Sequence, residues 1–566
     1  MRTPTRIAPF WPATAGLLLL FAAGFAQAET RTCPGDCDGN GDVTVDEILT
    51  GVNLALGSAE GATCPPLDLD QNDAITVDEI VSAVNAALIG CVEPATPTPV
   101  PTDTPEPTAT ATATATATIR TTLPEGISAG FAKRDITPFL AVAPPDGRVY
   151  LGGYGFGPGR RSTGVLAPIY VRAMVISDGE KVTAFAETET QGMFAKYRAN
   201  LGEVGMVDIA MRVEAATGGR IAREAVMIGS DHSHAGPDAI GVWGGVRASY
   251  LAYIRDQAVA AILEAYNELQ PAELKIGTVD AGEWLGSQFS EEPNDQVDRE
   301  LRVLAAFERD NPEKMFGLMI NYAAHSTVMG GENKLISGDW PSQVSANLEA
   351  QHGIDTALIM LADCGRTQPR GNFGGNDDYE SLASYGEKIT AKVNEALGNL
   401  VPAETGPIQA AQKFIRERYE NEFLSFALLS SVILRNITPP WGEGQVVGTL
   451  ASSVRVGNLL FNAMPGEGYP EIQFQMVERV PAQEHFIFGL ANDQLGYLIA
   501  PQEGYAKVRQ GFLDTGNDNA LFNVNPLIGD HVMCTLLKSA REIGFNLADD
   551  PAKCDPWAAE DNTLPY

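Results

Sequence analysis

The fold of this chain is indicated most clearly by one stretch, Ala225-Val-Met-Ile-Gly-Ser-Asp-His-Ser-His-Ala-Gly-Pro237. Residues 225–228 form an apolar run of the length of a buried strand, and this run leads directly into glycine and polar side chains. The same succession recurs in Ile320-Asn-Tyr-Ala-Ala-His325, which is followed by Ser326 and Thr327. Functional side chains gather in loops that follow strands, so both segments are candidate sites.

Similar apolar runs recur from residue 127 to residue 566. They predict strands at 169–176, 182–186, 225–228, 301–307, 316–322, 357–361, 458–464 and 486–490. Helical periodicity lies between several of them, for example over 250–269 and 379–397. This pattern predicts an α/β (mixed α+β) domain in which mixed β-sheets are covered by helices.

The balance of charge restricts the partners of the chain. With 566 residues the chain is long enough for two or more folded units, and its net charge is -33. So acidic a surface repels nucleic acid and anionic membranes at long range, which argues against a nucleic-acid partner.

Residues 1–28 have the features of an export signal. Arg2 and Arg6 give a positive start, residues 16–25 are apolar, and Ala26-Gln-Ala28 is a small-x-small cleavage site. An uncleaved anchor is the alternative. The longest later apolar segment, 423–434, has about 12 residues against the about 20 that a bilayer requires, so we expect a core helix there. The sequence predicts a secreted, periplasmic or cell-surface protein without a transmembrane segment after signal cleavage.

Seven cysteines are unevenly distributed along the chain. In an exported protein, four of them would form two disulfides, in any of three pairings: Cys33, Cys37, Cys64 and Cys91. Cys534 and Cys554 can form a third bridge, which leaves Cys364 as a buried thiol.

Residues 29–92 carry two copies of a calcium-loop pattern, in which oxygen-bearing side chains occupy loop positions 1, 3, 5 and 12. Gly41 allows the sharp turn of the first loop, whereas Asp73 makes the second loop less ideal. The predicted ligands are Asp36, Asp38, Asn40, Asp42 and Glu47 in the first copy and Asp68, Asp70, Asn72 and Glu79 in the second. Acidic turns without a metal are the alternative.

This pair of loops resembles type I dockerin modules. The resemblance implies a small all-α, calcium-binding module and a cohesin-like protein partner, although such repeats also serve as structural caps. Residues 93–126 are rich in Thr, Pro and Ala and lack large apolar side chains, which predicts a linker.

The chain has six histidines, and three of them lie in the two strand-end segments. Side chains alternate along an extended chain, so His232-Ser-His234 would place both imidazoles on one side, a suitable geometry for a metal and its neighbour. A metal or catalytic pair is one interpretation of this motif. A lone His325 would more often be a core histidine with satisfied hydrogen bonds.

Five ordered segments together resemble the neutral, or alkaline non-lysosomal, ceramidase family over roughly residues 127–510. They are Gly130-Phe-Ala-Lys-Arg-Asp-Ile-Thr-Pro138, Ser230-Asp-His-Ser-His-Ala-Gly-Pro237, His325-Ser-Thr327 with Leu335-Ile-Ser-Gly-Asp339, Met464-Pro-Gly-Glu467 and Gly489-Leu-Ala-Asn-Asp-Gln-Leu-Gly-Tyr497. The resemblance implies a zinc ion held by His232, His325, Glu467 and Tyr497. Two imidazoles and a carboxylate are a usual catalytic zinc set, and a phenolate is a less common fourth ligand.

The resemblance also implies hydrolysis of an N-acyl amide by zinc-activated water. His234 is the candidate to stabilise the oxyanion or to pass a proton to the leaving amine, with an orienting role as the alternative. We expect Asp231 and Asp339 to orient the ligand histidines, and Glu189 is a further candidate to lie near the metal.

One departure from the family concerns the substrate side. Ceramidases carry a Gly-Asp-Val-Ser-Pro-Asn segment with a catalytic serine, and here the matching stretch is Gly365-Arg-Thr-Gln-Pro-Arg370. Gln368 stands at the serine position and cannot be a nucleophile, which excludes a mechanism that needs this serine. Gln368 can still hydrogen-bond the substrate, and we count it with His234 and Asp339 among the catalytic candidates.

Three functions follow from these observations. The leading one is a zinc amidase that acts on ceramide or a related lipid-like N-acyl substrate. The second is a zinc hydrolase of another amide or ester. The third is a catalytically silent, secreted protein that binds partners through its calcium module.

Overall fold

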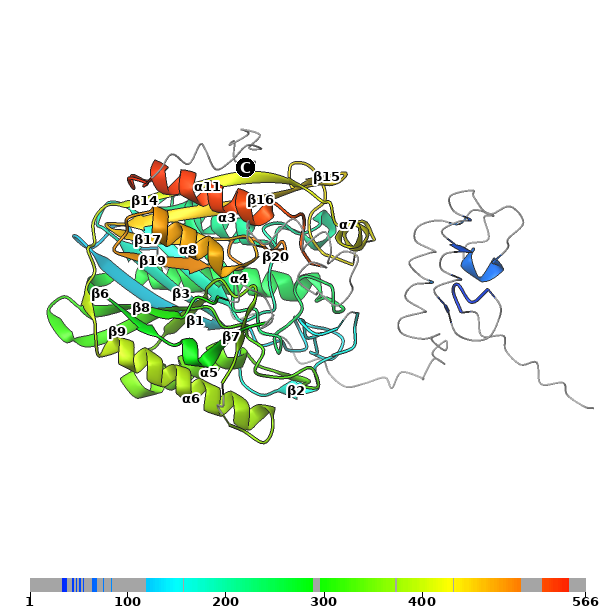
Figure 1. The fold of residues 1–566 in the computed structure, drawn as a ribbon, viewed down its shortest axis with the longest axis horizontal. Coiled ribbons are helices and arrows are strands. Elements are labelled where there is room, and N and C mark those ends of the chain that lie inside the picture. The colour runs from blue at the N-terminus through cyan, green and yellow to red at the C-terminus, as the bar shows by residue number, and fades with distance from the viewer. Residues whose placement is uncertain are drawn as a thin grey trace, which may run out of the picture. The chain divides into compact units, whose positions relative to one another are not determined.

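The structure is a computed structural model. It describes residues 119–548, apart from 156, 289–295, 372–373, 431 and 500–521, and in the first part of the chain it describes 33–37, 43–44, 47, 50–51, 54, 64–68, 75 and 83. The chain divides into two compact units, Met1–Glu106 and Pro107–Tyr566, and each is treated by itself (Figure 1).

The larger of the two main sheets in the described part of the second unit has nine strands. Its order is β11 (Ala357–Leu361), β9 (Asn311–Tyr322), β8 (Glu300–Glu308), β6 (Gln270–Asp280), β1 (Ser128–Asp135), β3 (Tyr170–Ser177), β4 (Val182–Thr188) and β5 (Ile221–Ser230), and β13 (Val401–Pro402) pairs with β6. The outer pairs β11·β9 and β4·β5 are parallel and the central pairs are antiparallel. The edge strand β11 also contacts β4 and β5, so the two ends of this sheet approach each other.

The smaller main sheet has five strands within the described residues. Its order is β14 (Ile408–Arg418), β16 (Val446–Val456), β17 (Leu459–Ala463) and β19 (Glu484–Phe488), and β15 (Gly442–Glu443) pairs with β16. Three two-stranded pairs lie in the connecting loops: β2 (Gly164–Val165) with β10 (Leu335–Ile336), β7 (Leu285–Ser287) with β12 (Thr367–Pro369), and β18 (Glu467–Gly468) with β20 (Tyr497–Leu498).

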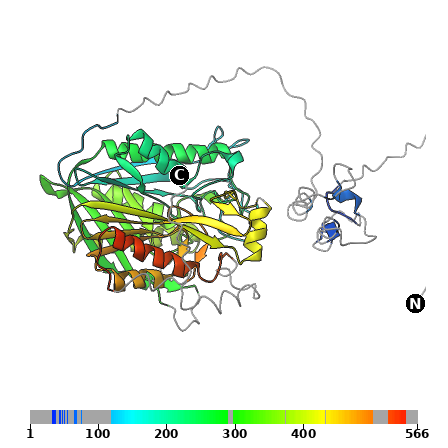
Figure 2. The ribbon, with the colours of Figure 1, turned by 90° about the horizontal axis from the view of Figure 1, so that it is seen from above.

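The two main sheets pack face to face, and helices cover their outer faces. Helices α3 (Met206–Ala216) and α4 (Ala248–Asn267) cover one half of the larger sheet, and α5 (Asp339–His352) and α6 (Asp378–Leu397) cover the other half. Helices α8 (Pro470–Arg479) and α11 (Ile528–Glu542) lie on the smaller sheet, where α11 runs along β14 and β16 (Figures 1 and 2). Short 3₁₀ turns, η2 (Ala199–Leu201) and η3 (Gly282–Trp284), complete the loops, together with helix α7 (Glu422–Leu429).

Alternation along the strands produces these layers. In β1, Ala129 and Phe131 face the second sheet, whereas Gly130 faces α4. A side chain at Gly130 would overlap the carbonyl oxygen of Ala265, so glycine lets α4 approach the sheet closely. The interior between the sheets is rich in aromatic contacts, of which the stacked rings of Phe461 and Phe486 are one.

The predicted mixed α/β architecture of the second unit is confirmed, and each predicted strand overlaps a strand of the structure. The helix expected over 423–434 is shorter, because α7 ends at Leu429, whose side chain is 63% exposed. Contacts of this unit begin before residue 127, since Ile119 and Leu123 pack against its core. No helix in the described ranges is long and apolar enough to cross a membrane.

The described residues of the first unit bear on few of the calcium predictions. Cys37 and Cys64 form a disulfide, Cys33 and Cys534 are also disulfide-bonded, and Cys364 is a free, buried thiol. The Glu47 carboxylate accepts hydrogen bonds from Cys37 N (2.8 Å) and Thr44 N (2.7 Å). Asp36 is buried and Asp68 is partly buried. The other predicted calcium ligands lie outside the described residues: Asp38, Asn40, Asp42, Asp70, Asn72 and Glu79.

Candidate metal centre and its cavity

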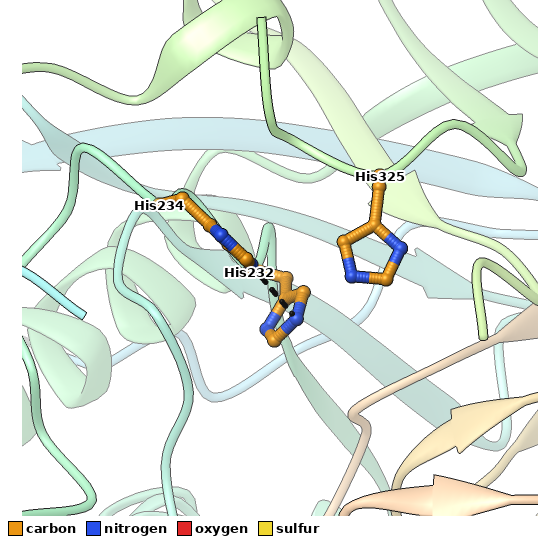
Figure 3. A group of neighbouring side chains, drawn as sticks. All are labelled: His232, His234 and His325. Carbon is orange, nitrogen blue, oxygen red and sulfur yellow. Dashed lines mark hydrogen bonds between the residues drawn. The ribbon is translucent and has the colours of Figure 1, made fainter. Parts of the chain in front are cut away.

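The first candidate segment leaves β5 in a sharp turn. His232 has φ 54°, so the His-x-His segment is not extended as predicted. Ser326 Oγ donates to Asp231 O (2.5 Å) and Ser233 Oγ donates to Ser337 O (2.8 Å), and these bonds hold the turn. The turn still brings the two rings together, with 3.4 Å between the Nε2 atoms of His232 and His234 (Figure 3).

The second candidate segment leaves β9 and reaches the same place. The curvature of the larger sheet brings the ends of β9 and β11 toward β5, and His234 N donates to Ser326 O (3.0 Å). The ring centroids of His232 and His325 are 4.8 Å apart, and Figure 3 shows the three imidazoles converging. One ring nitrogen from each of these three histidines lies within 4.8 Å of the others.

Main-chain carbonyls fix the orientation of two of the rings. Nδ1 of His232 bonds to Gln191 O (2.7 Å), and Nδ1 of His325 bonds to Cys364 O (2.8 Å). A carbonyl oxygen can only accept, so each Nδ1 carries the proton and each Nε2 keeps a lone pair for a ligand. A metal-binding histidine typically has this arrangement.

Glu467 and Tyr497 face each other across the short parallel pair β18·β20. Glu467 Oε2 lies 3.4 Å from His232 Nε2 and 3.3 Å from His325 Nε2, and it is buried without a hydrogen-bond partner. Burial opposes ionisation of Glu467, but the two histidines outweigh it and lower the pKa of this carboxyl. Burial, followed by the charge of Glu467, raises the pKa of the Tyr497 phenol, which is hydrogen-bonded to Glu467. All four predicted zinc ligands therefore converge.

His234 differs from its neighbours in its surroundings. Its Nδ1 is buried without a hydrogen-bond partner, and its ring meets the edge of Tyr154 at a centroid distance of 4.8 Å. Arg160 donates to His234 O (2.7 Å) and lies over the Tyr154 ring. Burial holds the pKa of His234 well below its usual range, so this imidazole is neutral.

Three predicted carboxylates do not touch the histidine rings. Asp339 accepts N–H groups of Val328 (3.2 Å), Met329 (2.8 Å) and Trp340 (2.7 Å), and burial raises its pKa to about 6 despite these bonds. Asp231 accepts from Ser233 N (3.1 Å). The expectation that these two aspartates orient the ligand histidines is not met, because the carbonyls of Gln191 and Cys364 occupy those positions.

The third of these carboxylates, Glu189, is held away from the centre. It forms a buried ion pair with Arg172 and accepts a hydrogen bond from Tyr170 N (3.0 Å). Glu189 is not among the residues that line the cavity described next. The prediction that it lies near the metal is therefore not supported by its contacts.

The histidines open into a cavity of about 620 Å³. One group of its lining residues is apolar and includes Ile240, Val242, Trp243, Leu424, Ile433 and Leu495. A second group is polar and includes Gln288, Thr327, Gln368, Arg370 and Ser381. Gln368 lines the cavity, and its Oε1 accepts a hydrogen bond from Thr327 Oγ1 (2.7 Å).

Several residues of the site were not found by sequence analysis. Gln191 supplies the carbonyl for His232, and Tyr154 and Arg160 support His234. The glycines before Tyr154 are a possible signal, because a side chain at Gly153 would overlap the His234 ring. The Gln191 carbonyl has no such signal, since any residue could supply it.

The side chains gathered here offer the nitrogen and oxygen ligands that Zn²⁺ prefers in proteins. They combine two imidazole nitrogens with free lone pairs, an ionised carboxylate whose Oε2 lacks a partner, and a phenol. His234 offers a further nitrogen within the same cluster. Buried polar atoms without partners are costly in a folded protein, and a bound cation would satisfy them.

Comparison with known proteins gives a family match for part of the second unit and a similar fold for most of the chain. Residues 128–363 match the family model of neutral/alkaline non-lysosomal ceramidase, N-terminal. The fold is similar to the crystal structure of neutral ceramidase from Pseudomonas aeruginosa, with a TM-score of 0.59, 17% sequence identity, and coverage of 76% of this chain and 78% of that chain. A structure of ceramidase complexed with C2 matches with a TM-score of 0.58, the same identity and the same coverage. No curated protein matches the sequence.

Proposed function

Residues 128–363 belong to the neutral/alkaline non-lysosomal ceramidase family, and from this premise we propose that the chain is an exported zinc-dependent hydrolase of N-acyl amides. The observation that carries the proposal is the convergence of four side chains. His232 and His325 follow strands β5 and β9, and Glu467 and Tyr497 lie on the pair β18·β20. These four side chains would hold the zinc ion. When bound, zinc supplies a Lewis acid and lowers the pKa of a coordinated water.

The protein's own groups orient the centre and handle the proton. The carbonyls of Gln191 and Cys364 keep the His232 and His325 tautomers fixed. His234 is the group that stabilises negative charge on the substrate oxygen or passes a proton to the leaving amine, since it adjoins His232 and keeps an unpartnered Nδ1. Tyr154 and Arg160 contact His234 and position it.

The cavity supports an acyl substrate. Its apolar group of lining residues can bury an alkyl chain beside the histidines, and its volume lies within the range of small-molecule sites. Gln368 stands where the family has its serine and offers hydrogen bonds but no nucleophile. The scissile bond is therefore attacked by water, and hydrolysis yields a fatty acid and an amine.

The test is release of fatty acid from a labelled short-chain ceramide and from a simple N-acyl amine by the full chain supplied with Zn²⁺. We expect release from at least one of these substrates, and we expect His232→Ala to abolish it while the far-ultraviolet circular dichroism stays unchanged. Equal release by wild type and His232→Ala, or no release from any N-acyl substrate by zinc-loaded protein, would refute the proposal.

For the first unit we propose a calcium-binding, dockerin-like module that docks onto a cohesin-like protein. The repeat of liganding residues supports this proposal, as does the Glu47 carboxylate, which folds back onto the loop at Cys37 and Thr44. Disulfide bonding of Cys33, Cys37, Cys64 and Cys534 suits an oxidising location, either extracellular, periplasmic or at the cell surface.

A further inference from the structure

The charge of the cavity wall is opposite to that of the molecule. The chain has 72 Asp and Glu against 39 Lys and Arg. Among the described residues that line the cavity, Glu467 is the only carboxylate, and Arg370 and Arg435 are both cationic. Glu467 belongs to the metal centre, and Arg435 is paired with the buried carboxylate of Asp493. The positive charge of Arg370 therefore remains uncompensated within the described wall.

Arg370 is held at the wall by its own strand pair. It directly follows β12, which pairs with β7, and its backbone N donates to Trp284 O (2.9 Å). The side-chain stem crosses Gly286, where a Cβ would overlap Arg370 Cγ. The side chain is exposed, and it forms no ion pair with a described residue. An arginine that is fixed at its stem, and whose guanidinium has no ion-pair partner in the described part of the chain, is prepared to bind an anion from solution.

A second donor lies two residues away on the same wall. Gln368 uses Oε1 to accept from Thr327 Oγ1, which leaves its Nε2 as a donor with no acceptor among the described residues. Gln288, whose backbone N donates to Arg366 O (2.7 Å), lines the same part of the cavity. Guanidinium and amide N–H groups together match the acceptor oxygens of an acidic group.

We propose that the amine half of the substrate carries an acidic group, which the guanidinium of Arg370 binds together with the amide of Gln368. The inference rests on the proposed amidase function and names its substrate class: an N-acyl amino acid or a similar N-acyl amine with an anionic head. Water adds across the amide C–N bond, so the products are a fatty acid and the free amino acid. The apolar lining residues of the cavity contact the acyl chain of the substrate, and the polar lining residues contact its acidic head group.

This arrangement distinguishes an acidic head from the uncharged head of ceramide. Ceramide offers hydroxyl groups, which accept a hydrogen bond from a guanidinium but leave its charge unpaired. A carboxylate head pairs the charge and can accept two parallel N–H bonds from the guanidinium, which makes the interaction stronger and more specific. The chain as a whole has a net charge of -33, so a local cation also favours the approach of an anionic substrate to the centre.

The experiment uses the zinc-loaded full chain with two substrates that differ only in the head charge, N-lauroylglycine and N-lauroylglycinamide. We expect kcat/KM to favour the glycine conjugate, and Arg370→Gln to lower this preference about tenfold, mostly through KM, as expected for loss of a charge-assisted bond. Arg370→Lys should retain part of the preference. Arg148→Gln removes an exposed guanidinium outside the cavity lining and should leave the preference unchanged.

The outcomes separate the inference from the proposed function. The inference is wrong if N-lauroylglycinamide or ceramide is cleaved with the same kcat/KM as N-lauroylglycine and Arg370→Gln does not change the ratio of these values. The amidase proposal would then still stand. If zinc-loaded wild type cleaves no N-acyl substrate, both fail. Added salt gives an independent readout, because screening should reduce the preference in wild type but not in Arg370→Gln.

Discussion

His232 and His325 show how little of a metal centre needs to be encoded in side chains. Each ring is oriented by a backbone carbonyl, from Gln191 and Cys364, and each therefore presents Nε2 to the same point. The positive φ of His232 turns the chain out of the strand, at a cost of order 1–3 kcal/mol that the surrounding hydrogen bonds must offset. Packing of the two loops on each other, through Ser326 and Asp231, supplies those bonds.

Gly153 is expected to set the position of His234. A methyl group at this position would overlap the imidazole, and the backbone has φ 96°, which a side chain tolerates poorly. We expect Gly153→Ala to lower kcat roughly 100-fold, because displacement of a catalytic group by about 1 Å has an effect of this size. Zinc content should be unchanged. Full activity in Gly153→Ala, or loss of zinc, would contradict the role given to His234.

His485 is expected to make the protein sensitive to acid. It is buried on β19, and burial, followed by the charge of Arg302, lowers its pKa from 6.5 to about 4. The unfolded chain thus binds a proton before the native state does, so the stability that neutral His485 contributes above pH 6.5 is lost as pH falls toward 4.

Urea unfolding at pH 7 and pH 4.5 tests this expectation. Between these values, wild type should lose roughly 2–3 kcal/mol more than His485→Gln, at about 1.4 kcal/mol per pKa unit. An equal loss in both proteins would show that His485 is not the responsible group.

The residues of the site could be predicted to different degrees. The four proposed ligands are found because chemically distinctive side chains follow apolar strands in a recognisable order. Asp339 and Asp231 are also distinctive, but their carboxylates accept from nearby backbone N–H groups instead of the rings. Sequence motifs give no information on which of several nearby acceptors a ring nitrogen will choose, so the carbonyls of Gln191 and Cys364 could not be foreseen.

At the scale of elements, the strand pair β7·β12 links the metal centre to the polar wall. Thr367 O accepts from His325 N, while the same short strand ends next to Arg370. One element thus places a histidine loop on one side and the proposed head-group contact on the other. The two-residue pair β18·β20 places Glu467 and Tyr497 next to each other, although they are far apart in the sequence.

Gly286 tests the proposed position of Arg370. A methyl group at residue 286 would meet the aliphatic stem of Arg370, a flexible part that can move, so the fold should survive. We expect Gly286→Ala to reduce the preference for N-lauroylglycine over N-lauroylglycinamide several-fold, in the same direction as Arg370→Gln, since the guanidinium must shift. An unchanged preference would mean that the stem position does not matter for substrate binding.

Elements with regular apolar patterns could be predicted, and those without them could not. Strands β8 and β11 are largely apolar runs and were predicted near their observed bounds, whereas only the apolar second half of β9, residues 316–322, was predicted, because its first residues are polar and exposed. β16 was not, because buried Thr449, Ser452 and Ser453 interrupt its pattern, and their hydroxyls bond to Asp493, Gln412 and Asn462 inside the protein. The pairs β18·β20 and β2·β10 are too short to show any periodicity.

At the scale of the whole molecule, the chain combines a proposed calcium module with a proposed zinc enzyme in two compact units. The net charge of -33 is carried by a surface whose long-range field favours cations. The predicted preference for a substrate with an acidic head depends on the positive charge of Arg370 in the cavity wall, which is opposite in sign to the net charge of the chain.

Calcium is expected to stabilise the first unit alone. Calorimetry of the full chain, in metal-depleted buffer and with Ca²⁺ at about 100 times its Kd, should show one transition raised by the equivalent of about 2.7 kcal/mol. Glu47→Gln should remove most of this shift, because the bidentate carboxylate of loop position 12 is lost. If Ca²⁺ shifts wild type and Glu47→Gln equally, the ion binds elsewhere.

The metal content of the purified full chain tests the proposed centre most directly. Zinc measured by inductively coupled plasma mass spectrometry should reach one ion per chain in wild type and in His234→Ala, and it should fall to background in His232→Ala, His325→Ala and Glu467→Gln. A wild-type protein that binds no zinc when zinc is supplied, or a His232→Ala variant that retains a full equivalent, would contradict the assignment.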